Sequence, residues 1–308
     1  MRWLLMFRNR SRTWCSDTTD TWFMPTSPPI LVDLEQTQHR IARLRQYVDE
    51  YLLREGEFIC EHYSACAASV PAYHDFREGT MSHVGHRFDL RRGDKPLRVV
   101  VVGQESGYDK NRPEFRRRVT VEGRYRQIHE LSGLKSRYSA TPGYETRNRH
   151  MTGTTSALRL IFGEGLGPDP GGEWVSPANG EPFHIFDGFA LVNRLLCYAG
   201  LPEGSNGLAT GVMLDNCREH FLATLMILEP TILILQGAKA AEWTNTFLTD
   251  VRKFSPYLYE GHLGAVRTVV CAFYHPSAQR PLQRWDHPLA PYLTEVVEPT
   301  LLEALRLS

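Results

Sequence analysis

Four short apolar runs rich in β-branched residues constrain this chain more than any other feature of its sequence. They cover residues 97–103, 189–196, 231–235 and 266–274. Runs of this length that are almost continuously apolar are typical of strands buried on both faces of a parallel sheet. Helix-like segments lie between them, and such alternation predicts a sheet covered by helices on both sides. We therefore expect an α/β fold, as a single three-layer α/β/α domain with a central four-stranded parallel sheet.

Two segments carry a clear helical period. Within residues 34–53 the apolar side chains Ile41, Leu44 and Val48 share one face, and Gly56 follows as a stop signal. Residues 213–228 show the same spacing. The first segment predicts an N-terminal helix outside the strand–helix alternation, and the second predicts a helix packed on the sheet.

The remaining stretches suggest how the chain is divided. Residues 1–30 are rich in Arg, Ser, Thr and Pro without periodicity, so we expect a flexible tail. Residues 31–308 then form the domain, with insertions at about 110–182. The end of that region, 163–182, is a Gly/Pro-rich loop with no helix or strand signal.

Targeting signals are weak. No stretch approaches the roughly 20 apolar residues of a membrane span, and the short apolar run near the start is too brief for a secretory signal. We expect a cytoplasmic protein with no membrane partner. In a reducing compartment the six cysteines predict metal binding or burial rather than disulfide bonds.

Charge is unevenly distributed along the chain. The 35 basic and 35 acidic residues cancel in total, but residues 110–150 contain eleven Lys and Arg against four Glu, a net charge of +7. Aromatic residues are interleaved with the basic ones. Arginines for phosphates with aromatic rings for stacking are typical of nucleic-acid contact. This segment favours a DNA partner over the alternative of a solvated charged face.

Polar residues stand where each predicted strand ends. The four ends read Gly-Gln-Glu-Ser-Gly from Gly103, Asn193-Arg194, Gln-Gly-Ala-Lys from Gln236, and His-Pro-Ser from His275. In parallel sheets, ligands bind at these carboxyl ends. The four motifs, in this order, resemble those of the uracil-DNA glycosylase superfamily over roughly residues 57–285.

That resemblance implies the catalytic residues. Glu105 would position water and stabilise the oxocarbenium-like sugar, and His275 would donate a hydrogen bond to the departing base. In the iron–sulfur branch of the family a Glu often stands one position earlier, where this chain has Gln104. This shift in register leaves Asp109 as a second candidate for the catalytic carboxylate.

The resemblance also implies how a flipped base is recognised. Asn193 would read the base edge, with one donor and one acceptor on its amide, and Gln104 would add contacts. Phe115 is a candidate for stacking on the base. Where the uracil-specific branch has a Tyr that blocks substituents at pyrimidine C5, this chain has Gly107, which leaves room for a C5-modified base.

Contacts to the DNA backbone are expected from residues close to these motifs. The segment from Ala278 to Trp285 could fill the space that a flipped base leaves in the stack. The candidates for binding phosphates are Ser277, Lys239, Arg116, Arg117 and Arg118.

One branch of the family carries a [4Fe–4S] cluster on four cysteines. The cysteines of this chain resemble those of that branch in their order along the sequence. Cys197 follows Asn193 closely, and Cys217 lies on the next predicted helix. Cys60 and Cys66 would supply the first pair, although five residues separate them where the family has two. Thiolates are the usual ligands of such clusters, whereas plain burial is the alternative reading.

We therefore expect a DNA glycosylase that excises uracil or a C5-modified cytosine, such as bacteriophage DNA carries, leaving an abasic site. Its setting would be repair or defence against phage. Two other functions are compatible with the sequence: a catalytically silent nucleic-acid-binding module that retains the fold, and a hydrolase of free nucleosides. The nucleoside hydrolase would have no use for the +7 segment.

Overall fold

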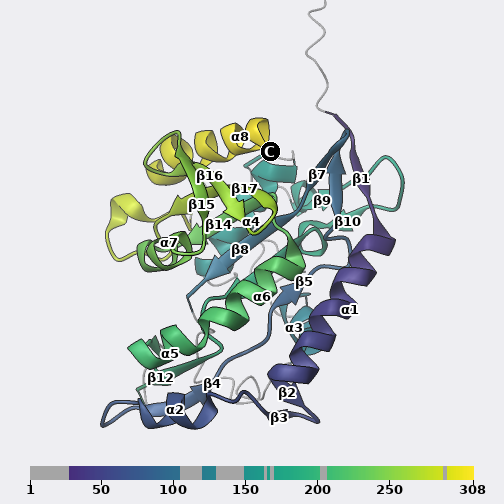
Figure 1. Cartoon of the computed structure of the whole chain (residues 1–308). Coiled ribbons are helices and arrows are strands. Elements are labelled where there is room, and N and C mark those ends of the chain that lie inside the picture. Colours follow the sequence, from purple (N-terminus) through teal and green to yellow (C-terminus); the bar gives the residue numbers. More distant parts are fainter. Residues whose placement is uncertain are drawn as a thin grey trace, which may run out of the picture.

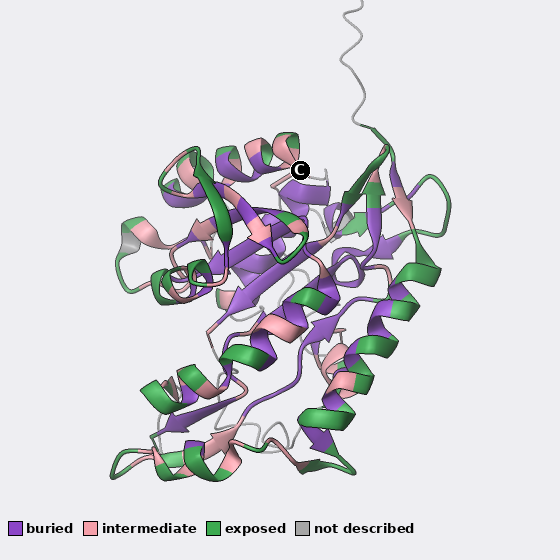
Figure 2. Ribbon diagram, in the orientation of Figure 1, coloured by how far each residue is buried: buried purple, intermediate pink, exposed green. Residues whose placement is uncertain are grey.

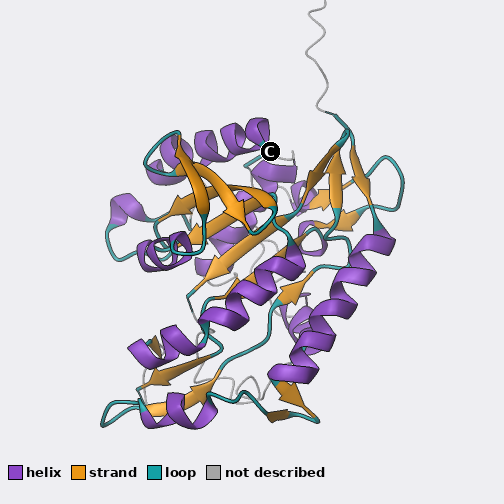
Figure 3. Ribbon diagram, in the orientation of Figure 1, coloured by secondary structure: helices purple, strands orange, loops and turns teal. Residues whose placement is uncertain are grey.

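A seven-stranded mixed sheet forms the centre of the molecule, with strand order β15-β16-β17-β14-β8-β11-β5 (Figure 1, Figure 3). The computed structural model describes residues 28–104, 120–129, 149–162, 165–166, 170–201, 207–286 and 290–308. Its strands are β5 (His83–Val84), β8 (Val99–Gly103), β11 (Phe189–Asn193), β14 (Ile232–Gln236), β15 (Thr249–Lys253), β16 (Leu258–Leu263) and β17 (Val266–Phe273). The α/β class expected from the sequence is confirmed.

The four apolar runs form β8, β11, β14 and β17. β8 pairs in parallel with β11 on one side and β14 on the other, and β14 pairs in parallel with β17. The expectation of only four strands was too small, because β5, β15 and β16 extend the sheet with antiparallel pairings. β15 is exposed at every position and β5 has only two residues, so neither carries the continuous apolar signal of a buried strand.

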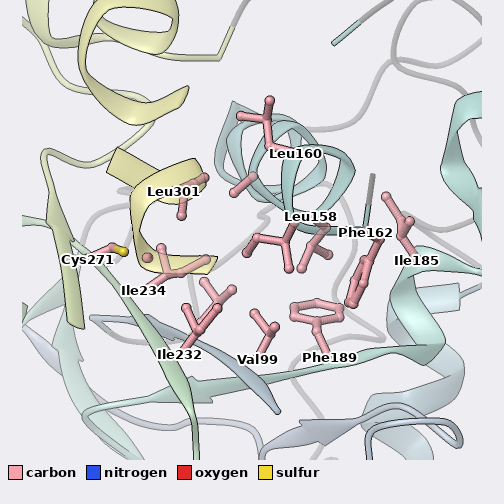
Figure 4. Packing of buried hydrophobic residues seen from close by; sticks show 14 of the residues in the cluster. Val99, Leu158, Leu160, Phe162, Ile185, Phe189, Ile232, Ile234, Cys271 and Leu301 are labelled. Carbon is pink, nitrogen blue, oxygen red and sulfur yellow. The ribbon is translucent and has the colours of Figure 1, made fainter. Parts of the chain in front are cut away.

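Helices cover both faces of this sheet. On one face Val99, Val101, Ile232 and Ile234 pack with α4 (Arg149–Phe162) and α8 (Glu298–Leu307) (Figure 4). On the other, the alternate residues of the same strands pack with α1 (Leu34–Tyr51) and α6 (Arg218–Leu228). Consecutive residues of a strand point to opposite faces, so a strand buried on both sides is apolar throughout, as Figure 2 shows for the centre of the sheet.

The predicted helices are confirmed with changes at their ends. α1 begins after Asp33, whose side chain accepts a hydrogen bond from the Gln36 backbone N–H at 3.0 Å, and it stops before the left-handed turn at Gly56. The segment 213–228 is two helices, α5 (Gly211–Asn216) and α6, which meet at Cys217. No helix in the described ranges is long and apolar enough to span a bilayer.

Short elements surround the main sheet. A second sheet joins β4, β12 and β13, next to α2 and α5, and a third joins β1, β6 and β7. The region 163–182 is not only loop, because a 3₁₀ turn (Pro170–Glu173) leads into β9. The remaining bounds are β1 (Ile30–Val32), β2 (Leu53–Arg54), β3 (Glu57–Phe58), α2 (Tyr63–Ala68), β4 (Asp75–Glu78), β6 (Leu90–Arg92), β7 (Lys95–Leu97), α3 (Val121–Ile128), β9 (Trp174–Val175), β10 (Phe183–His184), β12 (Cys197–Gly200), β13 (Gly207–Leu208) and α7 (Ala238–Asn245).

Candidate functional site

Polar side chains from several elements meet at the carboxyl ends of β8, β11 and β14. A methyl group placed on Gly103 would lie 3.1 Å from Asn193 Oδ1 and 3.6 Å from His150 Nε2, and one placed on Gly237 would lie 3.2 Å from Gln104 Nε2. Backbone bonds fix the chain here, since Leu195 N–H donates to Gln104 O at 3.1 Å. The structure thus brings together Gln104 and Asn193, which the sequence predicts, and His150, which it does not.

His275 sits at the end of the fourth parallel strand with a defined tautomer. The Ser277 backbone N–H donates to His275 Nδ1 at 3.2 Å, and Ser277 Oγ lies 2.7 Å from the same nitrogen. Because Nδ1 accepts a backbone hydrogen bond, the neutral ring carries its proton on Nε2. Burial lowers the pKa of His275 below its usual value. The ring therefore offers a neutral N–H donor.

His150, in the first turn of α4, lies against His275. The two rings are stacked, with centroids 5.5 Å apart and an interplanar angle of 21°. Burial, then the charges of His275 and Arg124, lower the pKa of His150 to about 3, against an opposing contribution from the side-chain amide of Gln236. His150 is therefore neutral at physiological pH.

Gly153 explains how α4 comes so close to the His275 loop. A methyl group at Gly153 would lie 2.6 Å from Pro276 Cβ and Cγ, so only glycine permits this approach. This glycine, three residues after His150, is the sequence signal that could have indicated a close-packed helix. Gly153 lies just beyond the basic segment 110–150, and the charge pattern of that segment gives no indication of the close packing.

Two large apolar side chains of the loop after His275 differ in exposure. Trp285 is fully buried, and its Nε1–H donates to the Tyr274 carbonyl at 2.7 Å. It therefore cannot enter a DNA stack. Leu282, in the middle of the same loop, is 78% exposed. Asp286 holds the end of the loop through Arg284 at 2.8 Å and Arg149 at 3.4 Å.

Other predicted residues fall into two groups. Lys239 lies in the first turn of α7, where its carbonyl accepts a hydrogen bond from Arg194 Nη1 at 3.3 Å. At the end of β14 the buried Gln236 donates from Nε2 to Thr154 Oγ1 at 3.1 Å. The predicted residues that lie outside the described ranges are Glu105, Gly107, Asp109, Phe115, Arg116, Arg117 and Arg118.

The four predicted cysteine ligands line one cavity between α2, β12 and the junction of α5 and α6. Its walls include Cys60, Cys66, Cys197 and Cys217, together with apolar side chains such as Phe58 and Phe76. Cys66, Cys197 and Cys217 are buried, whereas Cys60 is half-buried. The winding of α2 between Cys60 and Cys66 brings this widely spaced pair to the same cavity.

The thiols of this cavity are electrostatically linked. A hydrogen bond from Cys197 lowers the pKa of Cys217, and the same contact raises that of Cys197. Asn216 Nδ2 donates to Cys66 Sγ at 3.4 Å, and His220 Nε2 lies 3.5 Å from Cys60 Sγ. Soft sulfur donors of this kind are the ligands that thiolate-bound metal centres use, and the Glu219 carboxylate lies close to His220 beside them. Cys271 is buried inside β17, apart from this set.

Comparison with known proteins adds no further assignment. No protein-family model matches the chain, and no curated protein is significantly similar to it. The motifs, and the places that the structure gives them, are therefore the features that indicate a function.

Proposed function

We propose that this protein is a DNA glycosylase of the uracil-DNA glycosylase type, which hydrolyses the N-glycosidic bond of an aberrant or modified pyrimidine. The observation that carries the proposal is that Gln104 and Asn193 lie at the carboxyl ends of parallel strands, next to a neutral His275 that is linked to them through His150. The strand order β11-β8-β14-β17, with all four motifs at the strand ends, supports it. Ligands bind at this edge in open α/β sheets.

His275 fits the role of donor to the leaving base. When the glycosidic bond breaks, its electron pair goes to the base, and negative charge develops on a base oxygen. The Nε2–H of His275, set by the contact of Nδ1 with Ser277, would donate to that oxygen. Comparable donors contribute about 2.7–4 kcal/mol where they have been removed. A neutral donor avoids the desolvation cost of a buried cation before the base arrives.

Asn193 and His150 would form the walls around the base. The Asn193 amide, at the end of β11, has the donor and acceptor needed to read a pyrimidine edge. His150 offers a flat, neutral ring beside it, and aromatic faces stack on flipped bases. We assign to His150 the stacking role for which Phe115 is the sequence-based candidate.

The water and the DNA backbone complete the proposal. Glu105, next to Gln104 in the sequence, would orient the water that adds to the sugar, with Asp109 as the alternative. Lys239 at the start of α7 would bind a phosphate, aided by the helix dipole. Within the segment from Ala278 to Trp285, Leu282 is the residue proposed to fill the vacated stack, because its side chain is apolar and exposed.

Gly107 keeps two substrates in the proposal: uracil and a C5-modified cytosine. The first corresponds to repair and the second to defence against phage DNA in the cytoplasm. Base release should be measured with duplexes that carry uracil, hydroxymethylcytosine or glucosylated hydroxymethylcytosine, followed by alkaline cleavage at abasic sites. Release that is lost in Glu105→Gln and His275→Ala, but kept in a control variant of the partly exposed His74, supports the proposal. Tight DNA binding without release of any base would instead favour the silent binding module.

We further propose that Cys60, Cys66, Cys197 and Cys217 hold a [4Fe–4S] cluster. When bound, the cluster would act as a structural crosslink between the segment before β4 and the segment after β11. Protein purified anaerobically should be brown, with broad visible absorption and about four iron atoms per chain. Cys197→Ser should lose both, whereas the matched variant Cys271→Ser should keep them. Colourless, iron-free wild-type protein would contradict the proposal of a cluster. It would leave the glycosylase proposal unaffected.

A further inference from the structure

Arg124 is a positive charge for which the described part of the chain provides no carboxylate partner. It lies in the middle of α3, where Nη1 donates to Gln127 Oε1. Its Nε is buried, and no described residue accepts a hydrogen bond from it. Burial lowers the pKa of this guanidinium to about 10. A buried cation without a counter-charge is costly for a folded protein.

Two neighbours of Arg124 on α3, Glu122 and Tyr125, are engaged in docking the helix. Glu122 forms an ion pair with Arg45 of α1. The Tyr125 hydroxyl donates to Asp187 Oδ1 at 2.8 Å, and Arg87 approaches the other oxygen of that carboxylate at 3.4 Å. The carboxylates around α3 are therefore already used, and Arg124 is left out of the docking contacts.

Arg124 lies beside the strand that leads to the candidate site. Its helix packs against β5, which pairs with β11, and β11 ends at Asn193. After burial, the charge of Arg124 contributes to the lowered pKa of His150, which stacks on His275. The residue is partly exposed although its Nε is buried, so an anion would meet the outer end of the guanidinium.

We propose that Arg124 binds a phosphodiester oxyanion of the DNA strand next to the flipped nucleotide. This inference rests on the proposed function, because it takes DNA as the ligand. A guanidinium presents a planar fork of N–H donors that matches two phosphate oxygens. The anion would supply the counter-charge that the described residues do not give to Arg124.

The test compares Arg124→Gln with Arg126→Gln. Arg126 lies on the same helix and is exposed, so both variants remove one charge from the same region. The probe is a duplex with a central tetrahydrofuran abasic analogue, whose binding does not depend on which base is excised. Affinity is measured by fluorescence anisotropy over a series of salt concentrations.

The expected result is a loss of about tenfold or more for Arg124→Gln, the usual weight of a charge-assisted hydrogen bond. The slope of log affinity against log salt should become less negative by about 1. Arg126→Gln should change affinity by less than about threefold. Equal affinities for wild type and Arg124→Gln, or equal losses in both variants, would overturn the inference while leaving the glycosylase proposal in place.

A stability measurement separates this role from a structural one. A cation without a partner in the free protein costs stability, so Arg124→Gln should unfold at the same urea concentration as wild type or a higher one. A clear decrease would mean that Arg124 is held by an internal partner and would overturn the inference. If wild-type protein binds none of the duplexes, the proposed function fails as well, and that outcome is distinct from the other two.

Discussion

At the scale of single residues, the candidate site depends on imidazole rings kept neutral. Burial lowers the pKa values of His150 and His275, and stacking would place two charges close together if both were protonated. The Ser277 backbone N–H, rather than a carboxylate, fixes the tautomer of His275. A carboxylate in that place would raise the pKa of the ring and favour the charged form. The Ser277 backbone N–H leaves the ring neutral and so suits a neutral hydrogen-bond donor.

This arrangement predicts different effects for the two residues of the motif. His275→Ala should lower the single-turnover rate of base release by about 10²–10³-fold, because it removes the donor to the leaving base. Ser277→Ala should cost less than about tenfold, because the backbone N–H still holds Nδ1. Rapid-quench measurements on the best substrate would check both. Equal losses would show that the Ser277 hydroxyl has its own task, such as the phosphate contact implied by the family resemblance.

At the scale of elements, the sequence shows the buried parts of the fold well and the rest less well. The apolar runs place β8, β11, β14 and β17 to within a few residues, because a strand buried on both faces has to be apolar at nearly every position. β15 lacks that pattern because it is exposed throughout. The local amino-acid composition of an exposed edge strand does not indicate which strand it pairs with.

The residues of the candidate site also divide into those that the sequence predicts and those that it does not. Asn193 and His275 are predictable because each ends a recognisable strand. His150 is not, because its position depends on the packing of α4 against the Pro276 loop, more than 120 residues away in the chain. The four cysteines have predictable order, yet only the fold of α2 and the break at Cys217 show that they face one cavity.

The close approach of α4 gives a second prediction. Gly153→Ala would force a methyl group to 2.6 Å from Pro276, so it should reduce the free energy of unfolding by about 1–3 kcal/mol. It should also slow base release, because the His275 loop must shift. Gly211→Ala is the control, since an added methyl there meets no atom within 4 Å. Urea denaturation with equal stability for both variants would contradict the packing argument.

At the scale of the whole molecule, buried histidines and a buried ion pair hold distant segments together. Arg40 of α1 forms a 3.0 Å ion pair with Asp89 and also donates to the Ile227 carbonyl at the end of α6. Removing one partner of such a pair leaves an isolated buried charge and costs about 3–5 kcal/mol. Burial is also the main cause that lowers the pKa of six histidines: His83, His86, His129, His150, His220 and His275.

These histidines predict how stability changes with pH. Each has a folded-state pKa below its unfolded value near 6.5, so below that pH the unfolded chain binds more protons than the folded one. Stability should be constant above about pH 7 and fall on acidification, by up to about 1.4 kcal/mol per pH unit for each histidine. Urea denaturation at pH 7.5, 6.0 and 5.0 measures the slope. His83→Gln should reduce this slope, whereas substitution of the partly exposed His74 should change it less. An unchanged slope in His83→Gln would contradict the assignment.

The contact between Gly103 and His150 has a consequence for how this protein could change over evolutionary time. The chain leaves the sheet after β8 and returns at α4 almost at the same point, although more than forty residues intervene. The entropic cost of closing such a loop rises only slowly with its length. Segments of very different length and composition could therefore be exchanged at this junction while β8 and α4 keep their positions. Under the proposed function, relatives with the same strand ends and unlike inserts would be expected to differ in the base that they recognise.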